Sequence, residues 1–225
     1  MPPETRDTRE RLVESATELF WIKGYGNTGL AEVARHADAR PGSLYYFFPT
    51  KEDLLSAVLE RRKARIWQDL LTPIWDRVDD PIERVFALMA GYRQLLTMTE
   101  FSHGCPIGNL ALELSETHPH ARKLIADNFD NWTHAVAQCF VDAADRLPED
   151  VDPHQLAIFV LTNMEGAMML ARTYRDLRAY DAAITTLRDY VERLLKAGTT
   201  WAERRRERWH PELDDSAPST RPDEA

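Results

Sequence analysis

Apolar residues recur every three to four positions along most of the chain, which is the spacing of helices that bury one face. Between Thr8 and Gly24, for example, Leu12, Ala16 and Leu19 fall on one side of a helix. Proline and glycine separate further helices, predicted near 30–37, from Pro41 to the boundary at Phe48-Pro49-Thr50, and near 51–71, 81–99, 106–115, 120–146, 153–177 and 181–197. No run of alternating β-branched residues indicates a strand, so the pattern predicts an all-α fold.

The first helices are short and the later ones are long, which favours two units in a chain of 225 residues. We expect an N-terminal three-helix domain over 1–50 and a larger helical domain over 51–200, joined by the helix that begins at residue 51. The segment PELDDSAPSTRPDEA is rich in proline and acidic residues and has no apolar periodicity. We therefore expect the charged tail over 201–225 to be largely disordered.

The composition is that of a soluble globular protein, with 44% hydrophobic and 29% charged residues. No apolar run reaches the roughly 18 residues that span a bilayer, and the N-terminus lacks the apolar core of a secretory signal. We expect a cytoplasmic protein with no membrane association. The two cysteines, Cys105 and Cys139, fit a reduced compartment, and neither a metal site nor a cofactor is predicted.

The net charge of −9 argues at first against a nucleic-acid partner, but the charge is unevenly distributed. Residues 1–65 carry 11 Lys or Arg against 10 Asp or Glu, whereas residues 66–201 carry 12 against 20. The acidic excess therefore lies outside the N-terminal segment. Any contact with DNA phosphates has to be local and geometric, because no broad basic surface is predicted.

The stretch GYGNTG, residues 24–29, matches the G-x-G-x-x-G spacing of dinucleotide-binding loops. Such a loop requires a strand before its first glycine, and here an amphipathic helix precedes it. We interpret Gly24 as a left-handed helix end, Tyr25 as a cover over the small domain's core, and Asn27 or Thr28 as the cap of the next helix. The glycines do not predict a nucleotide cofactor.

The helix near 30–37 and the helix that begins at Pro41 are separated by about three residues, as in a helix-turn-helix. In that motif the second helix enters the major groove with its N-terminal residues at the base edges. We expect Phe48, and Tyr45 in part, to pack in the core. The predicted DNA contacts are Thr28, Arg40, Pro41, Gly42, Ser43, Tyr45, Tyr46 and Lys51.

These residues resemble the TetR family of bacterial transcriptional regulators. The resemblance runs from Thr28 through Gly42-Ser43-Leu44-Tyr45-Tyr46-Phe47-Phe48 to Thr50-Lys51-Glu52-Asp53-Leu54-Leu55, and it is continuous over the N-terminal 55 residues. Asp38 replaces the usual turn glycine, and aspartate tolerates the left-handed backbone needed there. Arg40 stands where serine is common, which affects the expected operator sequence. The resemblance implies a regulator, by family default a repressor, that binds a palindromic double-stranded DNA operator.

The resemblance also implies a homodimer in which the helices near 120–146 and 153–177 pair with their two-fold mates. The first helix carries an apolar seam with residues four and three apart, and the second carries small residues that allow close approach. Intramolecular core is an equally good reading for any single residue. The predicted interface residues are Ile125, Phe129, Val136, Phe140, Phe159, Met164, Gly166, Ala167 and Ala171.

The segment FSHGCPIGNL, residues 101–110, resembles a G-C-x-x-G-N-L element of one subgroup of the family, which implies a cysteine near the effector pocket. Cys105 precedes Pro106 at a predicted helix N-terminus, where the helix dipole is expected to lower the thiol pKa. An inert buried cysteine is the alternative. The predicted pocket for a small-molecule or electrophile effector contains Trp67, Tyr92, Phe101, His103, Cys105, Asn109, Trp132, Met164 and Met168.

Two other functions fit the composition. An enzyme is disfavoured because the chain has no H-E-x-x-H, G-x-S-x-G or P-loop motif and no predicted strands. A helical dimer that binds a ligand without binding an operator shares the same apolar pattern. That alternative does not require Gly42 and Lys51 at their spacing.

Overall fold

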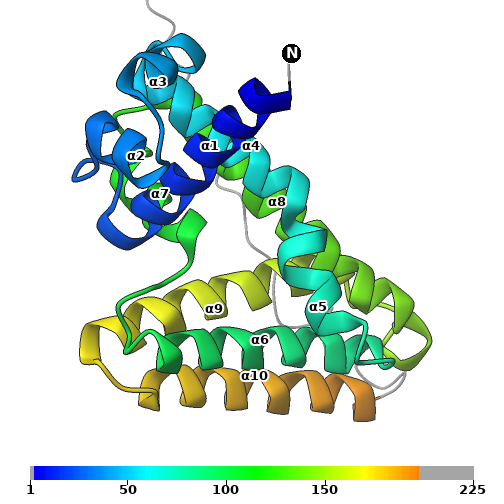
Figure 1. Ribbon diagram of the computed structural model, residues 1–225. Helices are drawn as coiled ribbons and strands as arrows, with labels where there is room; N and C mark the ends of the chain where they lie inside the picture. Colours follow the sequence, from blue (N-terminus) through cyan, green and yellow to red (C-terminus); the bar gives the residue numbers. More distant parts are fainter. Residues whose placement is uncertain (1–2, 198–225) are drawn as a thin grey trace, which may run out of the picture.

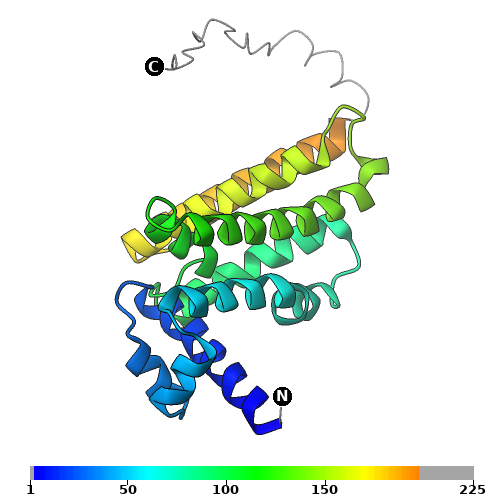
Figure 2. The ribbon, with the colours of Figure 1, turned by 90° about the horizontal axis from the view of Figure 1, so that it is seen from above.

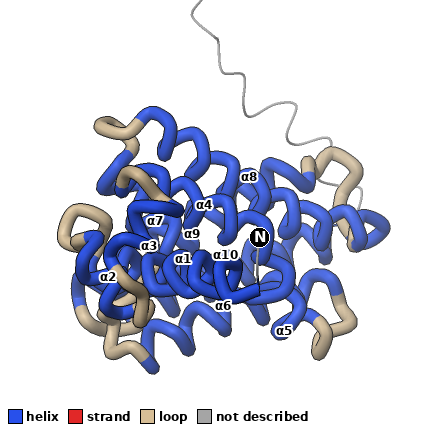
Figure 3. The backbone as a smooth tube through the Cα atoms, turned by 45° about the horizontal axis from the view of Figure 1, so that its top comes forward, coloured by secondary structure: helices blue, strands red, loops and turns tan. Residues whose placement is uncertain are grey.

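The computed structural model describes residues 3–197, and within that range it contains helices and turns but no strand (Figures 1 and 3), as expected. The helices are α1 (Pro3–Lys23), α2 (Leu30–His36), α3 (Pro41–Phe47), α4 (Lys51–Ile66), α5 (Thr72–Trp75), α6 (Pro81–Met98), α7 (Pro106–Leu114), α8 (Pro119–Asp142), α9 (Pro153–Tyr174) and α10 (Arg178–Ala197). None of them is long and apolar enough to cross a membrane. The predicted tail over 201–225 lies outside the described residues.

Local signals set most helix boundaries. Gly24 ends α1 with a φ of 83°, and Asp38 takes a φ of 48° in the turn between α2 and α3, as their residue types predict. Thr50 begins α4 with a capping box, because its side chain accepts from the Asp53 amide and Asp53 accepts from the Thr50 amide. The prediction of a side-chain cap on α2 was wrong, because its N-cap is Gly29 and no side chain caps it.

The helix predicted over 51–71 is α-helical only as far as Ile66. After Ile66 the chain makes one wider π turn, Trp67–Leu71, in which the amide of Thr72 donates to the carbonyl of Trp67. Pro73 explains the change, since a proline ring clashes with the carbonyl four residues earlier and lacks an N–H. The chain then continues as α5.

The helices form a small N-terminal unit and a larger bundle (Figure 1). In the small unit, α1, α2, α3 and the first half of α4 enclose one apolar core, which reaches Leu59 and includes Leu110 and Leu114 of α7. In the bundle, α8 packs against α4, α6 and α9, and α9 packs against α10. Figure 2 shows α9 and α10 side by side, on the side away from the N-terminal helices. Because the small core extends past residue 50, the division into 1–50 and 51–200 remains a proposal.

Candidate DNA-binding surface and effector cavity

The second helix of the helix-turn-helix, α3, presents its polar and aromatic residues outward. Leu44 and Phe48 are 1% and 2% exposed and anchor the helix in the small core. Tyr46 is 75% exposed and Tyr45 is 57% exposed. Tyr45 is therefore more exposed than its expected packing in the core implied. The aromatic residues of α3 therefore lie on different faces of the helix, and the rings of Tyr45 and Tyr46 are exposed to a partner.

The start of α3 carries a glycine that the fold itself does not require. A Cβ at Gly42 would meet no atom within 4 Å, and Gly42 is not among the residues with positive φ. Arg40 and Pro41 beside it are exposed, and Ser43 is half-buried. The N-terminal end of α3 thus offers an open surface that a partner's backbone can approach closely, as base readout requires.

Two of the predicted DNA contacts have other tasks in the structure. Thr28 is 1% exposed, and its hydroxyl donates to the carbonyl of Gly24 at 2.8 Å. The ammonium of Lys51 donates to the carbonyl of Tyr25 at 2.5 Å and lies 4.2 Å from the centre of that ring. Burial lowers the pKa of Lys51. Both side chains fasten the turn before α2. The buried Thr28 hydroxyl has no surface to offer a phosphate, and the phosphate contact of Lys51 stays a prediction.

Other cations of the small unit are better placed to meet phosphates. Arg35 and Arg40 are exposed and form no ion pair with a carboxylate of the described residues. The guanidinium of Arg9 lies over the Phe48 ring, 5.3 Å from its centre. By contrast, Lys23 pairs with Glu32, and Arg61 pairs with Glu14. Sequence reasoning did not single out Arg9 or Arg35, because their isolation from carboxylates depends on the folded arrangement.

A cavity of about 410 Å³ lies in the larger bundle, within the range of about 300–1,000 Å³ typical of small-molecule sites. Tyr92 of α6 and Trp132 of α8 form part of its wall, and the indole N–H of Trp132 donates to the Tyr92 hydroxyl at 3.2 Å. Cys105 and Met164 also line it, as predicted for the pocket. The cavity reaches α1 and α4 through Trp21 and Arg62.

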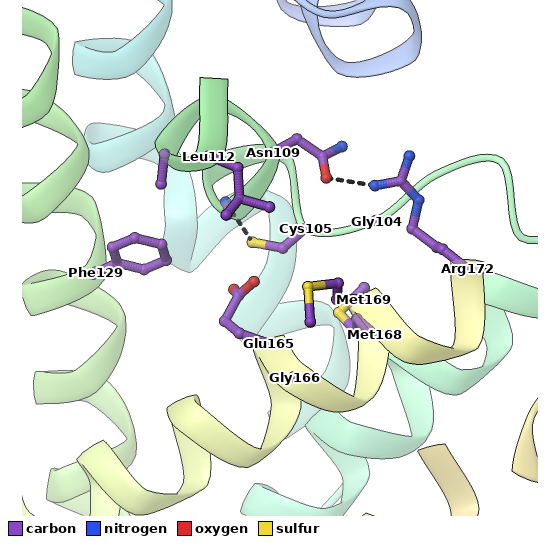
Figure 4. A pocket seen from close by; sticks show the side chains of 12 residues that line it. Gly104, Cys105, Asn109, Leu112, Phe129, Glu165, Gly166, Met168, Met169 and Arg172 are labelled. Atoms are coloured by element: carbon purple, nitrogen blue, oxygen red, sulfur yellow. Dashed lines mark hydrogen bonds between the residues drawn. The ribbon is translucent and has the colours of Figure 1, made fainter. Parts of the chain in front are cut away.

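A second cavity of about 260 Å³ adjoins the first, and Cys105, Phe129 and Glu165 line both (Figure 4). Asn109 and Met168 line this smaller cavity. The remaining predicted pocket residues, Trp67, Phe101 and His103, line neither. Trp67 packs edge-on against Trp75 with their ring centres 5.6 Å apart, and His103 packs edge-on against Trp21 with their ring centres 4.7 Å apart. These aromatic contacts hold the Trp67 and His103 rings outside the two cavities.

The Cys105 thiol is buried at the N-cap of α7, where its sulfur accepts from the Gly108 amide at 3.3 Å. Burial is the largest cause that raises the pKa of this thiol, and the nearby Glu165 raises it further. The expectation that the helix N-terminus lowers the thiol pKa was therefore wrong, because desolvation outweighs the helix dipole here. Among residues 3–197, no group of three or more His, Cys, Asp or Glu side chains could hold a metal ion.

The glycines of the G-C-x-x-G-N-L element make room for polar side chains of α9. A Cβ at Gly108 would lie 2.2 Å from a carboxylate oxygen of Glu165, and a Cβ at Gly104 would lie 2.8 Å from Arg172. Arg172 donates to the side-chain oxygen of Asn109 at 2.6 Å (Figure 4). The element therefore joins the start of α7 to α9.

The opposite end of α7 reaches the DNA-binding unit. The carboxylate of Glu113 accepts from the backbone amides of Tyr25 at 2.9 Å and Gly26 at 2.5 Å. Just before α7, the carbonyl of Gly104 accepts from the indole N–H of Trp21 at 2.8 Å. One short helix thus contacts both the cavity wall and the turn that precedes α2.

Most of the predicted dimer residues are used inside one chain. The seam of α8 meets α4, α6 and α9 of the same chain, and α9 also packs inward on α8 and α10. Those buried by 95% or more are Ile125, Val136, Phe140, Met164, Ala167 and Ala171, so they have no surface to offer a second copy. Phe129 and Gly166 are half-buried, and Phe159 is 43% exposed. The six buried residues are therefore used within one chain, whereas Phe129, Phe159 and Gly166 remain predictions for the interface.

Both units match known regulators. Residues 12–58 match the bacterial regulatory proteins of the tetR family, and residues 81–187 match the tetracyclin repressor-like C-terminal domain. The chain belongs to the TetR family. This TetR-family chain is 32% identical to an uncharacterized HTH-type transcriptional regulator of Mycobacterium tuberculosis over 189 residues, which are 81% of this chain and 93% of the relative.

Two further relatives of this TetR-family chain agree with that assignment. The HTH-type transcriptional repressor DhaR of a Mycobacterium species is 24% identical over 181 residues, covering 80% of this chain and 89% of DhaR. The crystal structure of the reduced form of NemR from E. coli superposes with a TM-score of 0.69 at 25% identity, covering 81% of this chain and 96% of NemR. The chain is therefore a helix-turn-helix transcriptional regulator, which excludes the enzyme alternative.

Proposed function

We propose that the protein is a repressor that binds a palindromic operator as a homodimer and releases it when a small molecule occupies the cavity of the larger bundle. The observation that carries the proposal is the exposed N-terminal end of α3. Gly42 has open space around it and Tyr46 is 75% exposed, so the fold itself does not account for these residues. Contact with base edges and phosphates does account for them.

Dimerisation is best supported by the outer face of α9 and α10. The apolar side chains exposed on these two helices include Ile158, Phe159, Leu170, Tyr174 and Tyr190, each with 37–61% of its surface exposed. Met169 is exposed too, but it lines the smaller cavity. The rings of Phe159 and Tyr190 pack edge-on at 5.5 Å and join the two helices. Gly166 of α9 lines the smaller cavity, and a Cβ there would meet no atom within 4 Å. A large exposed apolar face of this kind marks an interaction surface.

Two-fold symmetry has a direct consequence for DNA recognition. A dimer places two copies of α3 on half-sites separated by about one helical turn or a multiple of it. A ligand that favours a different separation of the two copies shifts the population away from the operator-bound form. Helix α7 supports such coupling, because Cys105 at its start lines the cavity and Glu113 at its end holds the turn before α2.

The test is fluorescence anisotropy of a labelled duplex from the region upstream of the protein's own gene, with a scrambled duplex as the control. If Arg9, Arg35 and Arg40 of both protomers neutralise phosphates, a plot of the logarithm of the binding constant against the logarithm of the salt concentration has a slope of about −5. We expect tight binding to the upstream duplex alone. Equal affinity for the scrambled duplex would contradict the proposal.

A further inference from the structure

Within residues 3–197, the guanidinium of Arg62 at the larger cavity has no hydrogen-bond or ion-pair partner. It lies on α4, lines the larger cavity and is half-buried. Its guanidinium carbon lies 5.6 Å from the centre of the Trp21 ring, but no described carboxylate lies within 4 Å and it donates no hydrogen bond to a described residue. A guanidinium carries five N–H donors and stays charged. These donors are available to an anion that enters the cavity.

The neighbouring charged groups do not supply that partner. Arg65 and Asp69, both at the cavity, pair with each other at 3.3 Å. Glu165 also lines the cavity, and burial is the largest cause that raises the pKa of its carboxyl. Among the described residues that line the cavity, Arg62 is therefore the cation without an ion-pair partner. A monoanion matches it, whereas a doubly charged phosphate ester would find a single free cation and a carboxylate nearby.

Much of the rest of the wall is apolar. Around Arg62 the cavity is lined by the side chains of Ile66, Leu70, Ile74, Leu95, Phe129, Trp132 and Leu161. Burying apolar surface of a ligand against them contributes roughly 25 cal/mol per Å². A planar carboxylate fits the two parallel N–H groups of a guanidinium. We infer that the effector is an apolar monocarboxylic acid whose carboxylate binds Arg62, an inference that rests on the proposed role of this cavity.

The test uses matched acids and amides on the full chain. Octanoate and 4-phenylbutyrate are titrated against the protein alongside octanamide and 4-phenylbutyramide, with quenching of tryptophan fluorescence as the readout, since Trp21 and Trp132 line the cavity. We expect each acid to bind about tenfold to a hundredfold more tightly than its amide. Arg62→Gln should remove that difference, and Arg62→Lys should keep part of it because a point charge remains.

Lys63→Gln is the control, because it removes a cation of the same helix that does not line the cavity. It should leave the preference for acids in place. Thermal unfolding of each variant shows whether it is folded. Equal affinity for acids and amides, an unchanged preference in Arg62→Gln, or no binding of either acid would overturn the inference. Operator binding by the protein without ligand is measured separately, so its loss would instead count against the proposed function.

Discussion

The carboxylate of Glu113, at the C-terminal end of α7, accepts a hydrogen bond from the backbone amide of Tyr25 at 2.9 Å. The amide of Gly26 donates to the same carboxylate. These amides belong to the stretch whose glycine spacing resembles a phosphate-binding loop. The turn does bind an anion, but the anion is a side chain of the same protein. Through this contact, the helix that begins at the cavity ends on the DNA-binding unit.

Replacing Glu113 by Ala should weaken the attachment of this turn. Two hydrogen bonds to a charged group are lost at a partly exposed site, so we expect the free energy of unfolding to fall by about 1–2 kcal/mol. The amides of Tyr25 and Gly26 should exchange faster with deuterium. Urea unfolding and hydrogen exchange measure the two effects. Glu116→Ala, an exposed carboxylate just past α7, is the control and should change neither.

The same Glu113→Ala variant tests whether α7 transmits the effect of a ligand. The cavity does not include Glu113, so ligand affinity should be unchanged. Release of the operator by a saturating ligand should be weaker than in the wild type, because the contact between the end of α7 and the turn is lost. Full release in the variant would show that another contact carries the coupling.

Asp80 and Arg146 should give the bundle a pH-dependent stability in the acid range. Arg146 donates to Asp80 at 2.6 Å and, with the amides at the start of α6, lowers the Asp80 pKa to about 2 from an ordinary value of 3.8. Because the folded-state pKa is the lower one, the stabilisation is present above about pH 4 and is lost as the pH falls toward 2.

The variant Asp80→Asn isolates this charge, because asparagine still caps a helix. We expect it to be less stable than the wild type by roughly 1 kcal/mol or less at neutral pH, since the pair is largely exposed. Urea unfolding at a series of pH values should show the difference vanishing near pH 2. Asp79→Asn removes the same charge from an exposed residue with no arginine partner and should show no such trend. A difference that stays constant down to pH 2 would refute the assignment.

The two thiols should be unreactive in the folded protein. Burial raises the pKa of Cys105 well above its ordinary value and raises that of Cys139 to about 11. Because the thiolate is the nucleophile, iodoacetamide at pH 7.5 should label both cysteines slowly until the protein is unfolded. Mass spectrometry of timed samples measures the rates. Rapid labelling of native Cys105 would restore the electrophile-sensing hypothesis, and Cys105→Ser should otherwise respond to ligands as the wild type does.

The outer face of α9 and α10 should hold the dimer together. Phe159→Asp places a charge in the middle of the apolar face, so we expect monomers in analytical ultracentrifugation and weaker operator binding. Met98→Asp is the control, because Met98 is 74% exposed on α6, outside that face. Dimers of unchanged stability in Phe159→Asp would place the interface elsewhere.

Local chemistry explains why the helix boundaries were predictable from the sequence. Gly24, Asp38 and the Thr50 capping box act through their own backbone and near neighbours, and each takes the predicted conformation. The outward placement of Tyr46 follows in the same way, because the helical period separates its face from that of Leu44 and Phe48.

Long-range contacts explain what the sequence did not predict. Thr28 and Lys51 are polar residues near a DNA-binding helix, but their partners in the turn draw both inward. The seam of α8 predicted a helical partner without telling whether that helix belongs to the same chain. Arg62 and Glu165 come from helices about a hundred residues apart, so their shared cavity appears only in the fold.

The central claim is that the N-terminal end of α3 contacts DNA, and Gly42→Leu tests it most directly. The added side chain begins in open space, so the melting temperature should match that of the wild type. It also fills the surface that has to approach the groove. We predict that anisotropy with the upstream duplex will show operator affinity falling at least about a hundredfold, with the variant folded and dimeric. Unchanged affinity in a folded Gly42→Leu dimer would contradict the account.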